Sequence, residues 1–183
     1  MESIEFYNTP EGDVMYKPIG KPVQVLTPES RDIIDEMLDV IKTRYPQAFK
    51  ALCELYTASE LNRKIYEFNI VSRFCRCNFG EYDAHTPDID AYGFFHFEEV
   101  KCPLRGECQL EGVVCKPEID TSLTDREMEV YRLIVANIRT EDIAAKLSLS
   151  KFTIIRHREN IKARLGLHDI PEMITYWHVH HLK

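Results

Sequence analysis

The sequence predicts two domains of different structural class: an α+β domain over residues 1–119 and an all-α domain over residues 120–183. Two observations predict this division. From Leu123 onwards, apolar residues recur at helical spacing between clear helix start and stop signals. Before that point, helical patterns are mixed with segments that alternate like strands. The expected linker is the run 120–122, shortly after Pro117.

The charge of the chain changes at the same place. The 183 residues carry a formal net charge of −7. Residues 1–120 hold 13 Lys and Arg against 22 Asp and Glu, whereas residues 121–183 hold 10 against 8. An acidic region repels nucleic acid, so we expect residues 1–119 to sense a signal or to contact a protein.

The sequence also bears on where the protein works. It has no apolar run long enough to span a membrane and no secretory signal pattern at its N-terminus. We therefore expect a cytoplasmic protein that does not enter a membrane. In that compartment the six cysteines are not expected to form structural disulfides.

The acidic domain is expected to combine short strands with helices. Strands are predicted near Met15 and at residues 23–25, within a region rich in Pro and Gly. Three helices are predicted. The first begins just after Thr27 and stops before Pro46, the second begins at Pro46, and the third begins at Ser59. From residue 71 the pattern changes, because residues 71–79 alternate like a strand and residues 93–100 look like its hairpin partner.

Five of the six cysteines lie in or after this predicted hairpin: Cys75, Cys77, Cys102, Cys108 and Cys115. On a strand, Cys75 and Cys77 would point to the same side. Thiolates that converge from turns suit tetrahedral zinc, so four of the five are candidate ligands, with His85 and His96 in reserve.

Two other interpretations of the cysteines stay open. Cysteine thiolates also hold iron–sulfur clusters, and the C-x5-C-x6-C run from Cys102 to Cys115 is similar to the spacing in Rrf2-type iron–sulfur regulators. The third interpretation is a set of reduced thiols with no cofactor at all, because no motif here decides the matter.

The basic domain begins with a complete helix-start signal. The Thr124 hydroxyl can accept from the backbone N–H of Glu127, and the Glu127 carboxylate can reach back to the N–H of Thr124. Leu123 and Met128 occupy the flanking apolar positions. A second, short helix is expected from Thr140, with two acids in its first turn.

A third helix is expected between a cap at Ser150 and a stop at Gly166. On a helical wheel, Ile154, Ile161 and Leu165 share one face and would dock on the first two helices. The opposite face is mostly polar and its flanks are basic. Two helices joined by a tight turn, the second with such an outer face, have the geometry that enters the major groove of double-stranded DNA.

These residues resemble the LuxR-type helix-turn-helix family, also called GerE-like. The resemblance rests on residues 123–127, 141–144, 150–157 and 160–166, about a third of the chain. It implies a four-helix DNA-binding domain of a bacterial transcription regulator, in which the third helix reads the groove. The fourth helix, here from about 169 to 180, often forms a dimer contact. Its apolar stripe would be Ile170, Met173, Ile174 and Trp177.

The third helix and its cap supply the candidate DNA contacts: Ser150, Lys151, Thr153, Ile155, Arg156, Glu159, Asn160, Lys162 and Arg164. Arg156 is the best candidate to read a base, because a guanidinium can pair with guanine through two hydrogen bonds. The hydroxyls and the other basic side chains of the set suit phosphate contacts, which position a protein without specifying sequence.

Two of these positions depart from the family pattern. The family often has lysine in place of Ile155, and a basic or polar residue in place of Glu159. Ile155 could touch a thymine methyl group, and Glu159 could accept from a cytosine amino group. The same two residues could also mean that DNA binding is weakened or altered.

Two functions from different classes remain. The first is a sequence-specific transcription regulator that acts as a homodimer and is modulated by its cysteine-rich acidic domain, through a protein partner or a small ligand. The second is a protein-interaction adaptor whose helix-turn-helix has drifted and now binds a partner protein, which Ile155 and Glu159 favour. No phosphate-binding glycine loop or nucleophile signature is present, so an enzyme is not expected.

Overall fold

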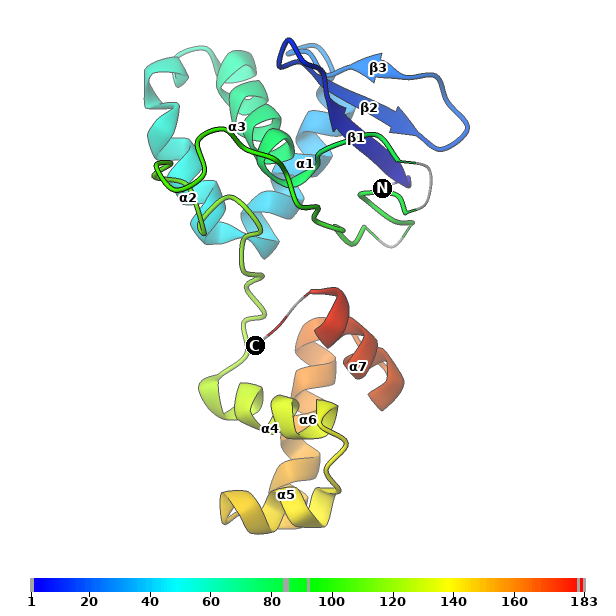
Figure 1. The fold of residues 1–183 in the computed structure, drawn as a ribbon. Helices are drawn as coiled ribbons and strands as arrows, with labels where there is room; N and C mark the ends of the chain where they lie inside the picture. The colour runs from blue at the N-terminus through cyan, green and yellow to red at the C-terminus, as the bar shows by residue number, and fades with distance from the viewer. Residues whose placement is uncertain (1, 84–85, 92, 181, 183) are drawn as a thin grey trace. The chain divides into compact units, whose positions relative to one another are not determined.

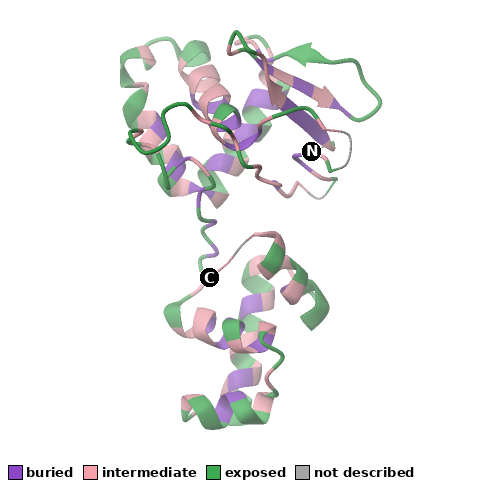
Figure 2. Cartoon of the chain, in the orientation of Figure 1, coloured by how far each residue is buried: buried purple, intermediate pink, exposed green. Residues whose placement is uncertain are grey.

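The computed structural model describes residues 2–83, 86–91, 93–180 and 182 (Figure 1). The chain forms two compact units, Met1–Glu118 and Ile119–Lys183. Each unit has its own buried residues, and exposed residues cover its outside (Figure 2). None of the helices among the described residues combines the length and the apolar character that crossing a membrane requires.

The first unit opens with a three-stranded antiparallel sheet in the order β1-β2-β3. The strands are β1 Ile4–Asn8, β2 Val14–Pro18 and β3 Gln24–Val25. The strands predicted near Met15 and at 23–25 are therefore confirmed, whereas β1 was not predicted. In β1, Glu5 is buried and its carboxylate accepts from the Asp83 N–H at 2.9 Å. A buried acid between two buried apolar residues removes the alternation that marks a strand.

Three helices follow the sheet: α1 Arg31–Arg44, α2 Pro46–Leu55 and α3 Arg63–Asn78, with a short 3-10 helix at Thr57–Ser59. The predicted break at Pro46 is confirmed. The helix α1 begins later than predicted, because Ser30 and Thr27 close a turn in which the Ser30 N–H donates to the Thr27 carbonyl. The helix α3 begins after Asn62, whose side chain accepts from the N–H of Ile65.

The predicted cysteine-bearing β-hairpin is wrong. Residues 71–78 lie in α3, and residues 93–100 form an irregular segment. The buried residues of α3 are Ile70, Val71, Phe74, Cys75 and Asn78, which is the spacing of one helix face. On a strand, Phe74 would have pointed to the side opposite Val71, so the apparent alternation ignored the largest apolar side chain of the run.

The irregular segment after α3 completes the core of the first unit. The Phe6 ring of β1 stacks on Phe79 with centroids 5.3 Å apart, and Phe79 meets the edge of Phe95 at 5.9 Å. Phe95 in turn stacks on Tyr45 at the end of α1, at 5.8 Å. Isolated bridges also join Ile89 to Ile4 and to Phe95. Rings from a loop therefore connect the sheet to the helices.

A buried carboxyl group secures this loop to the sheet. Asp88 is 2% exposed, and its Oδ2 accepts from the Phe6 N–H at 2.7 Å. Burial raises the pKa of Asp88 to about 9, and the neighbouring carboxylates of Glu5, Glu98 and Asp83 raise it further against the effect of the Phe6 hydrogen bond. Asp88 is therefore a neutral acid at pH 7.

The second unit consists of four helices: α4 Asp125–Val135, α5 Thr140–Leu147, α6 Lys151–Leu165 and α7 Ile170–Val179. The predicted all-α architecture of this part is thus confirmed. Its core consists of Val130, Tyr131, Ile134, Ile143, Ala144, Ile154, Ile161 and Met173. The Tyr131 hydroxyl donates to the Met173 carbonyl at 2.6 Å, and the Tyr131 ring meets Trp177 at 4.9 Å in a T-shaped contact.

Candidate nucleic-acid interface and cysteine cluster

The helix α6 is defined at both ends by its own sequence. Ser150 caps its first turn by accepting from the Thr153 N–H, and the two hydroxyls lie 2.8 Å apart. Gly166 ends it in the left-handed conformation, at φ 68°. The turn from α5 passes through Ser148, also left-handed at φ 54°. The caps predicted for the third helix are therefore confirmed.

Packing fixes which face of α6 is free. Ile154 and Ile161 are buried against α4 and α5. Phe152 and Arg156, on the outer side, are exposed, and Phe152 is 82% exposed. The Phe152 ring is therefore available to a partner outside the domain. Phe152 is not among the DNA contacts predicted from the sequence.

The first two turns of α6 carry polar groups that are available to a ligand. Among the residues that the structure describes, Arg156 takes part in no hydrogen bond or ion pair. Lys151 is exposed and pairs with Glu141 of α5. The ammonium group of Lys151 holds the pKa of Glu141 below its usual range, so this pair is charged at pH 7. Ser150, Lys151, Thr153 and Arg156 thus lie on one end of the helix.

The last two turns of α6 hold the domain together instead. Arg164 donates to the Ser122 carbonyl at 2.6 Å and lies 3.5 Å from the Glu127 carboxylate. Lys162 donates to the His168 carbonyl at 3.2 Å. Asn160 hydrogen-bonds to Glu127 as well. These three candidate DNA contacts are therefore bonded to other segments of their own domain, which the sequence pattern could not reveal. Lys151 and Glu159 also have ion-pair partners within the domain.

Glu127 is the centre of this second set of contacts. The Thr124 N–H donates to the Glu127 carboxylate at 2.9 Å and the Glu127 N–H donates to the Thr124 hydroxyl oxygen at 3.3 Å, which together form the predicted capping box. The Thr124 hydroxyl also donates to the Glu127 carboxylate, at 2.8 Å. Burial opposes ionisation of Glu127, but the hydrogen bonds from Thr124, the Arg164 charge and Asn160 outweigh it and lower the pKa. A buried carboxylate thus connects the start of α4 to the end of α6.

The two positions that depart from the family pattern lie in the middle of α6. Ile155 is half-buried. Glu159 is exposed and pairs with Lys162 at 2.8 Å and with Arg158 at 3.5 Å. The hydrogen bond from Lys162 and the charge of both bases lower the pKa of Glu159. Glu159 is therefore an anion on the same face as Arg156, one turn further along the helix.

The predicted stripe of α7 is divided between the core and the surface. Met173 is fully buried and Trp177 packs against the core. Ile170 is 39% exposed and Ile174 is half-buried. The half of the stripe that packs inwards cannot also contact a second subunit.

In the first unit, α3 separates two cysteines that the sequence analysis had placed on one side. Residues two apart on a helix differ by about 200° in direction. Cys75 is fully buried, and burial raises its pKa well above the usual value. Cys77 is half-buried on another side of the helix, and burial together with the nearby Cys115 raises its pKa to about 12. All six cysteines are free thiols.

Asn78, next to Cys77, connects the end of α3 to two distant segments. Its side chain donates to the Val114 carbonyl at 2.8 Å and accepts from the Lys116 N–H at 2.6 Å. Its own carbonyl accepts from the Glu98 N–H at 2.9 Å. Asn78 is fully buried, so these bonds are shielded from water. They place Cys115, which lies between Val114 and Lys116, beside Cys77.

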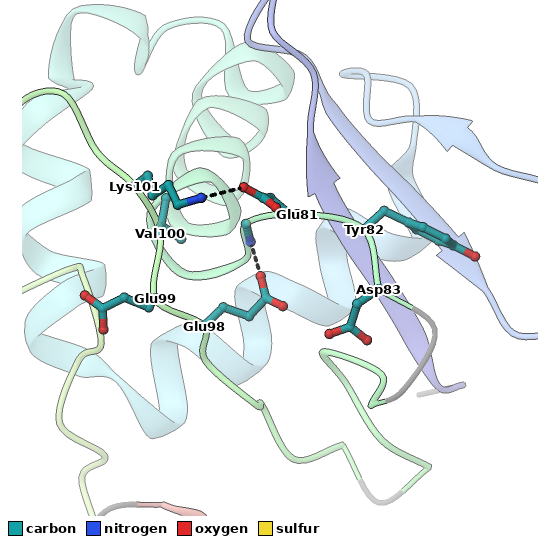
Figure 3. Close-up of a pocket in the computed structure, with 8 residues that line it drawn as sticks. Glu81, Tyr82, Asp83, Glu98, Glu99, Val100 and Lys101 are labelled. Carbon is teal, nitrogen blue, oxygen red and sulfur yellow. Dashed lines mark hydrogen bonds and ion pairs between the residues drawn. The ribbon is translucent and has the colours of Figure 1, made fainter.

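Figure 3 shows how the segment before Cys102 is secured. The Glu98 carboxylate accepts from the Gly80 N–H at 2.5 Å, and Lys101 pairs with Glu81 at 3.2 Å. A side chain on Gly80 would clash, because a Cβ there would lie 2.9 Å from the Glu98 carboxylate. The pocket drawn in Figure 3 is lined by eight residues, four of which are acids that already have partners, so we assign no ligand to it.

As they stand, the described residues contain no group of three or more His, Cys, Asp or Glu side chains that would already hold a metal ion. His96 lies 3.3 Å from the Asp90 carboxylate rather than beside the cysteines. His85, the other reserve ligand, lies outside the described residues. The metal set predicted from the sequence is therefore not preformed.

Comparison with known proteins identifies the second unit. The sequence pattern of the family described as "Bacterial regulatory proteins, luxR family" (GerE) matches residues 121–177. Fimbriae Z protein of Escherichia coli strain K12 is 33% identical over 88 residues, which is 48% of this chain and 40% of that protein. Fimbriae Z protein of Salmonella typhimurium is 41% identical over 63 residues, 34% of this chain and 30% of that protein.

A regulator with another name is similar as well. The HTH-type transcriptional regulator DctR of Escherichia coli O6:H1 is 35% identical over 74 residues, which is 40% of this chain and 42% of that protein. The chain thus spans less than half the length of these relatives. No solved structure matches the chain. The matched family is one of bacterial regulatory proteins. Residues 121–177 are a LuxR-family helix-turn-helix domain.

Proposed function

We propose that this protein is a sequence-specific DNA-binding transcription regulator, and that the first two turns of α6 enter the major groove. The observation that carries the proposal is the difference between the two ends of α6. Asn160, Lys162 and Arg164 are bonded within the domain, whereas Arg156 extends into solvent without a partner among the described residues. An arginine without a partner can pair with a base edge without first breaking another contact.

The proposed roles follow from the exposed groups. Arg156 pairs with a guanine edge, and Phe152 packs on a thymine methyl group. Ser150 and Thr153 lie at the N-terminus of α6, where the helix dipole favours phosphate. Lys151 exchanges its contact with Glu141 for a phosphate.

The two departures from the family act in the middle of the helix. Glu159 faces the same groove, where it accepts from a cytosine amino group, and Ile155 contributes apolar contact. Asn160, Lys162 and Arg164 support α6 in its position.

We further propose that two copies bind together through α7. Met173 and Trp177 are used inside the domain, so the contact would be made by Ile170 and its exposed neighbours. A two-fold pair of helix-turn-helix domains reads two half-sites about one helical turn apart, roughly 34–36 Å. The acidic first unit would modulate this binding in response to a protein partner or a small ligand, because its charge disfavours direct contact with DNA.

The experiment is site selection followed by titration. The full chain is used to select duplexes from a random pool, and affinity for the selected duplex is measured at several salt concentrations. Arg156→Ala should weaken binding by about 5-fold to 150-fold, equivalent to about 1–3 kcal/mol, and should relax the preference at one base pair. The control is Arg132→Ala, an exposed arginine on α4, which should bind as the unmodified protein does.

Two outcomes would contradict the proposal. Affinity that does not fall as salt rises would show that no phosphates are contacted. Failure to enrich any sequence, together with wild-type behaviour of Arg156→Ala, would favour the adaptor function, in which Phe152 and Ile155 contact a protein.

A further inference from the structure

Four of the six cysteines gather around the end of α3, and the function proposed above does not use them. Cys77, Cys102 and Cys115 line one hollow, and Cys77 and Cys115 lie close enough to perturb each other's pKa. Cys102 and Cys108 lie close enough to Cys115 to affect its electrostatic environment. Arg73, one turn before Cys77 on α3, has its Nη2 3.9 Å from the Cys108 sulfur. We call Cys77, Cys102, Cys108 and Cys115 the thiol cluster.

The loop that carries two of these thiols, Cys102 and Cys108, has no core of its own. None of residues 101–113, all of which the structure describes, is buried, and none lies in a helix or strand. Leu104 and Val113 are 49% and 36% exposed. A segment that buries so little apolar surface is not held by the hydrophobic effect, and natural proteins commonly secure such segments with a metal ion or a disulfide.

Positive side chains surround the thiol cluster. Cys77, Cys102 and Cys115 line a hollow of about 370 Å³ together with the bases Arg73, Arg76, Lys101 and Arg105. The Arg73 Nε is buried and has no hydrogen-bond partner among the described residues. A metal ion bound by four thiolates carries a net charge of −2, and N–H groups that donate to the sulfurs stabilise it. The bases thus suit a negative centre rather than four neutral thiols.

We propose that the thiol cluster binds one Zn²⁺ ion in a tetrahedral site with four sulfur ligands. At Zn–S bonds of about 2.3 Å the four sulfurs lie about 3.8 Å apart, so the thiols must converge, and three of them, Cys77, Cys102 and Cys115, already line one hollow. The ligands are not preformed, so binding draws the 101–113 loop onto α3. Each thiol gives its proton to solvent as its sulfur bonds to zinc, and no electron is transferred.

The structure excludes the other two cysteines from this site. Cys75 is fully buried on another side of α3, and Cys53 lies in α2. The sequence alone allowed any four of Cys75, Cys77, Cys102, Cys108 and Cys115. The helix selects Cys77 over Cys75, and that choice can be tested directly.

The experiment uses the full chain purified without an affinity tag and without oxygen. Elemental analysis should find one zinc per chain with no iron or acid-labile sulfide. Replacing zinc by Co²⁺ should give the visible bands and the sulfur-to-metal charge-transfer band of a tetrahedral tetrathiolate site. Cys77→Ser, Cys102→Ser, Cys108→Ser and Cys115→Ser should each lose most of the zinc. The controls Cys75→Ala and Cys53→Ala should keep it.

A ligand variant could lose zinc simply by failing to fold. Cys115→His guards against this, because a set of three thiolates and one imidazole also holds zinc. It should keep one zinc per chain and shift the cobalt bands to shorter wavelength, which a purely structural role for Cys115 would not produce.

Several results would overturn the proposal. Iron with labile sulfide would assign the thiol cluster to an iron–sulfur centre. A chain without metal that takes up neither Zn²⁺ nor Co²⁺ would leave free thiols. Loss of zinc in Cys75→Ala, with zinc retained in Cys77→Ser, would mean that Cys75 and not Cys77 is the ligand.

Discussion

The two units of this chain are specified by different kinds of information. In Ile119–Lys183, each helix begins or ends on a signal within a few residues, such as the Thr124 cap or the Gly166 stop. In Met1–Glu118, buried polar groups connect segments far apart in sequence, as Asp88 does with Phe6 and Asn78 does with Val114. Local signals can be read from the chain, whereas long-range polar contacts become visible only in the structure.

The largest expected effect tests those long-range contacts. Asn78→Ala removes the hydrogen bonds to Val114 and Lys116 and leaves buried backbone groups unpaired. We expect the free energy of unfolding of the first unit to fall by about 3 kcal/mol, with little change in the second. Urea unfolding followed by tyrosine fluorescence and circular dichroism would measure it. Asn69→Ala, which loses one 3.3 Å bond to Ser59, should cost less than about 1 kcal/mol.

The matching test of local information is Thr124→Ala. It removes the capping box at the start of α4 and should lower the stability of the second unit by about 1–2 kcal/mol. Thr175→Ala, an exposed threonine on α7 with no capping role, should change it by less than about 0.5 kcal/mol. Equal losses in the two variants, measured by thermal unfolding, would mean that the box contributes nothing.

A pH-dependent effect is expected from Asp88. Below about pH 4 both the folded and unfolded states hold the proton, but between about pH 4 and pH 9 only the folded state does, so stability falls as pH rises. Asp88→Asn keeps an acceptor for the Phe6 N–H and does not ionise. The variant should gain at least about 1 kcal/mol over the natural protein between about pH 5 and pH 8. A stability difference that is constant across this range would disprove the buried neutral acid.

The smallest effect concerns the pair of Lys151 and Glu141. Lys151→Ala should weaken DNA binding about equally for all sequences and reduce the slope of log affinity against log salt by about 1. Glu141→Gln should strengthen binding slightly, because it frees Lys151 for phosphate. Titrations of both variants on selected and unrelated duplexes would show this. A change confined to the selected duplex would mean that Lys151 reads a base.

The predictions from the sequence follow the same division. Capping residues and apolar spacing were enough for the four helices of the second unit and for the break at Pro46. The alternation over 71–79 predicted a strand instead of the end of α3, because it left out the apolar Phe74. The strand β1 was not predicted, because the buried Glu5 interrupts its apolar pattern. Helical spacing around Phe74 would have corrected the first error. Nothing in the sequence indicates that Asn78 brings Cys115 to Cys77.

For the DNA interface, the sequence identified the correct helix but not the division along it. The sequence divided the nine candidates by chemistry, into base and phosphate contacts, but not by their place along the helix. The structure shows that Arg164 and Asn160 bond to Glu127, which lies more than thirty positions earlier in the chain. A helical wheel of α6 alone cannot show that Glu127 is their partner. The exposure of Phe152 is likewise a property of the packed domain.

Arg156→Ala and Arg164→Ala should be compared first, each assayed for DNA affinity and for stability of the second unit. We expect opposite outcomes for these two arginines of one helix. Arg156→Ala should lose about 1–3 kcal/mol of binding with unchanged stability, because its side chain has no partner in the domain. Arg164→Ala should lose about 1 kcal/mol of stability and bind nearly as well once folded. Equal losses of affinity in two equally stable variants would contradict the division of α6 into a reading end and a supporting end.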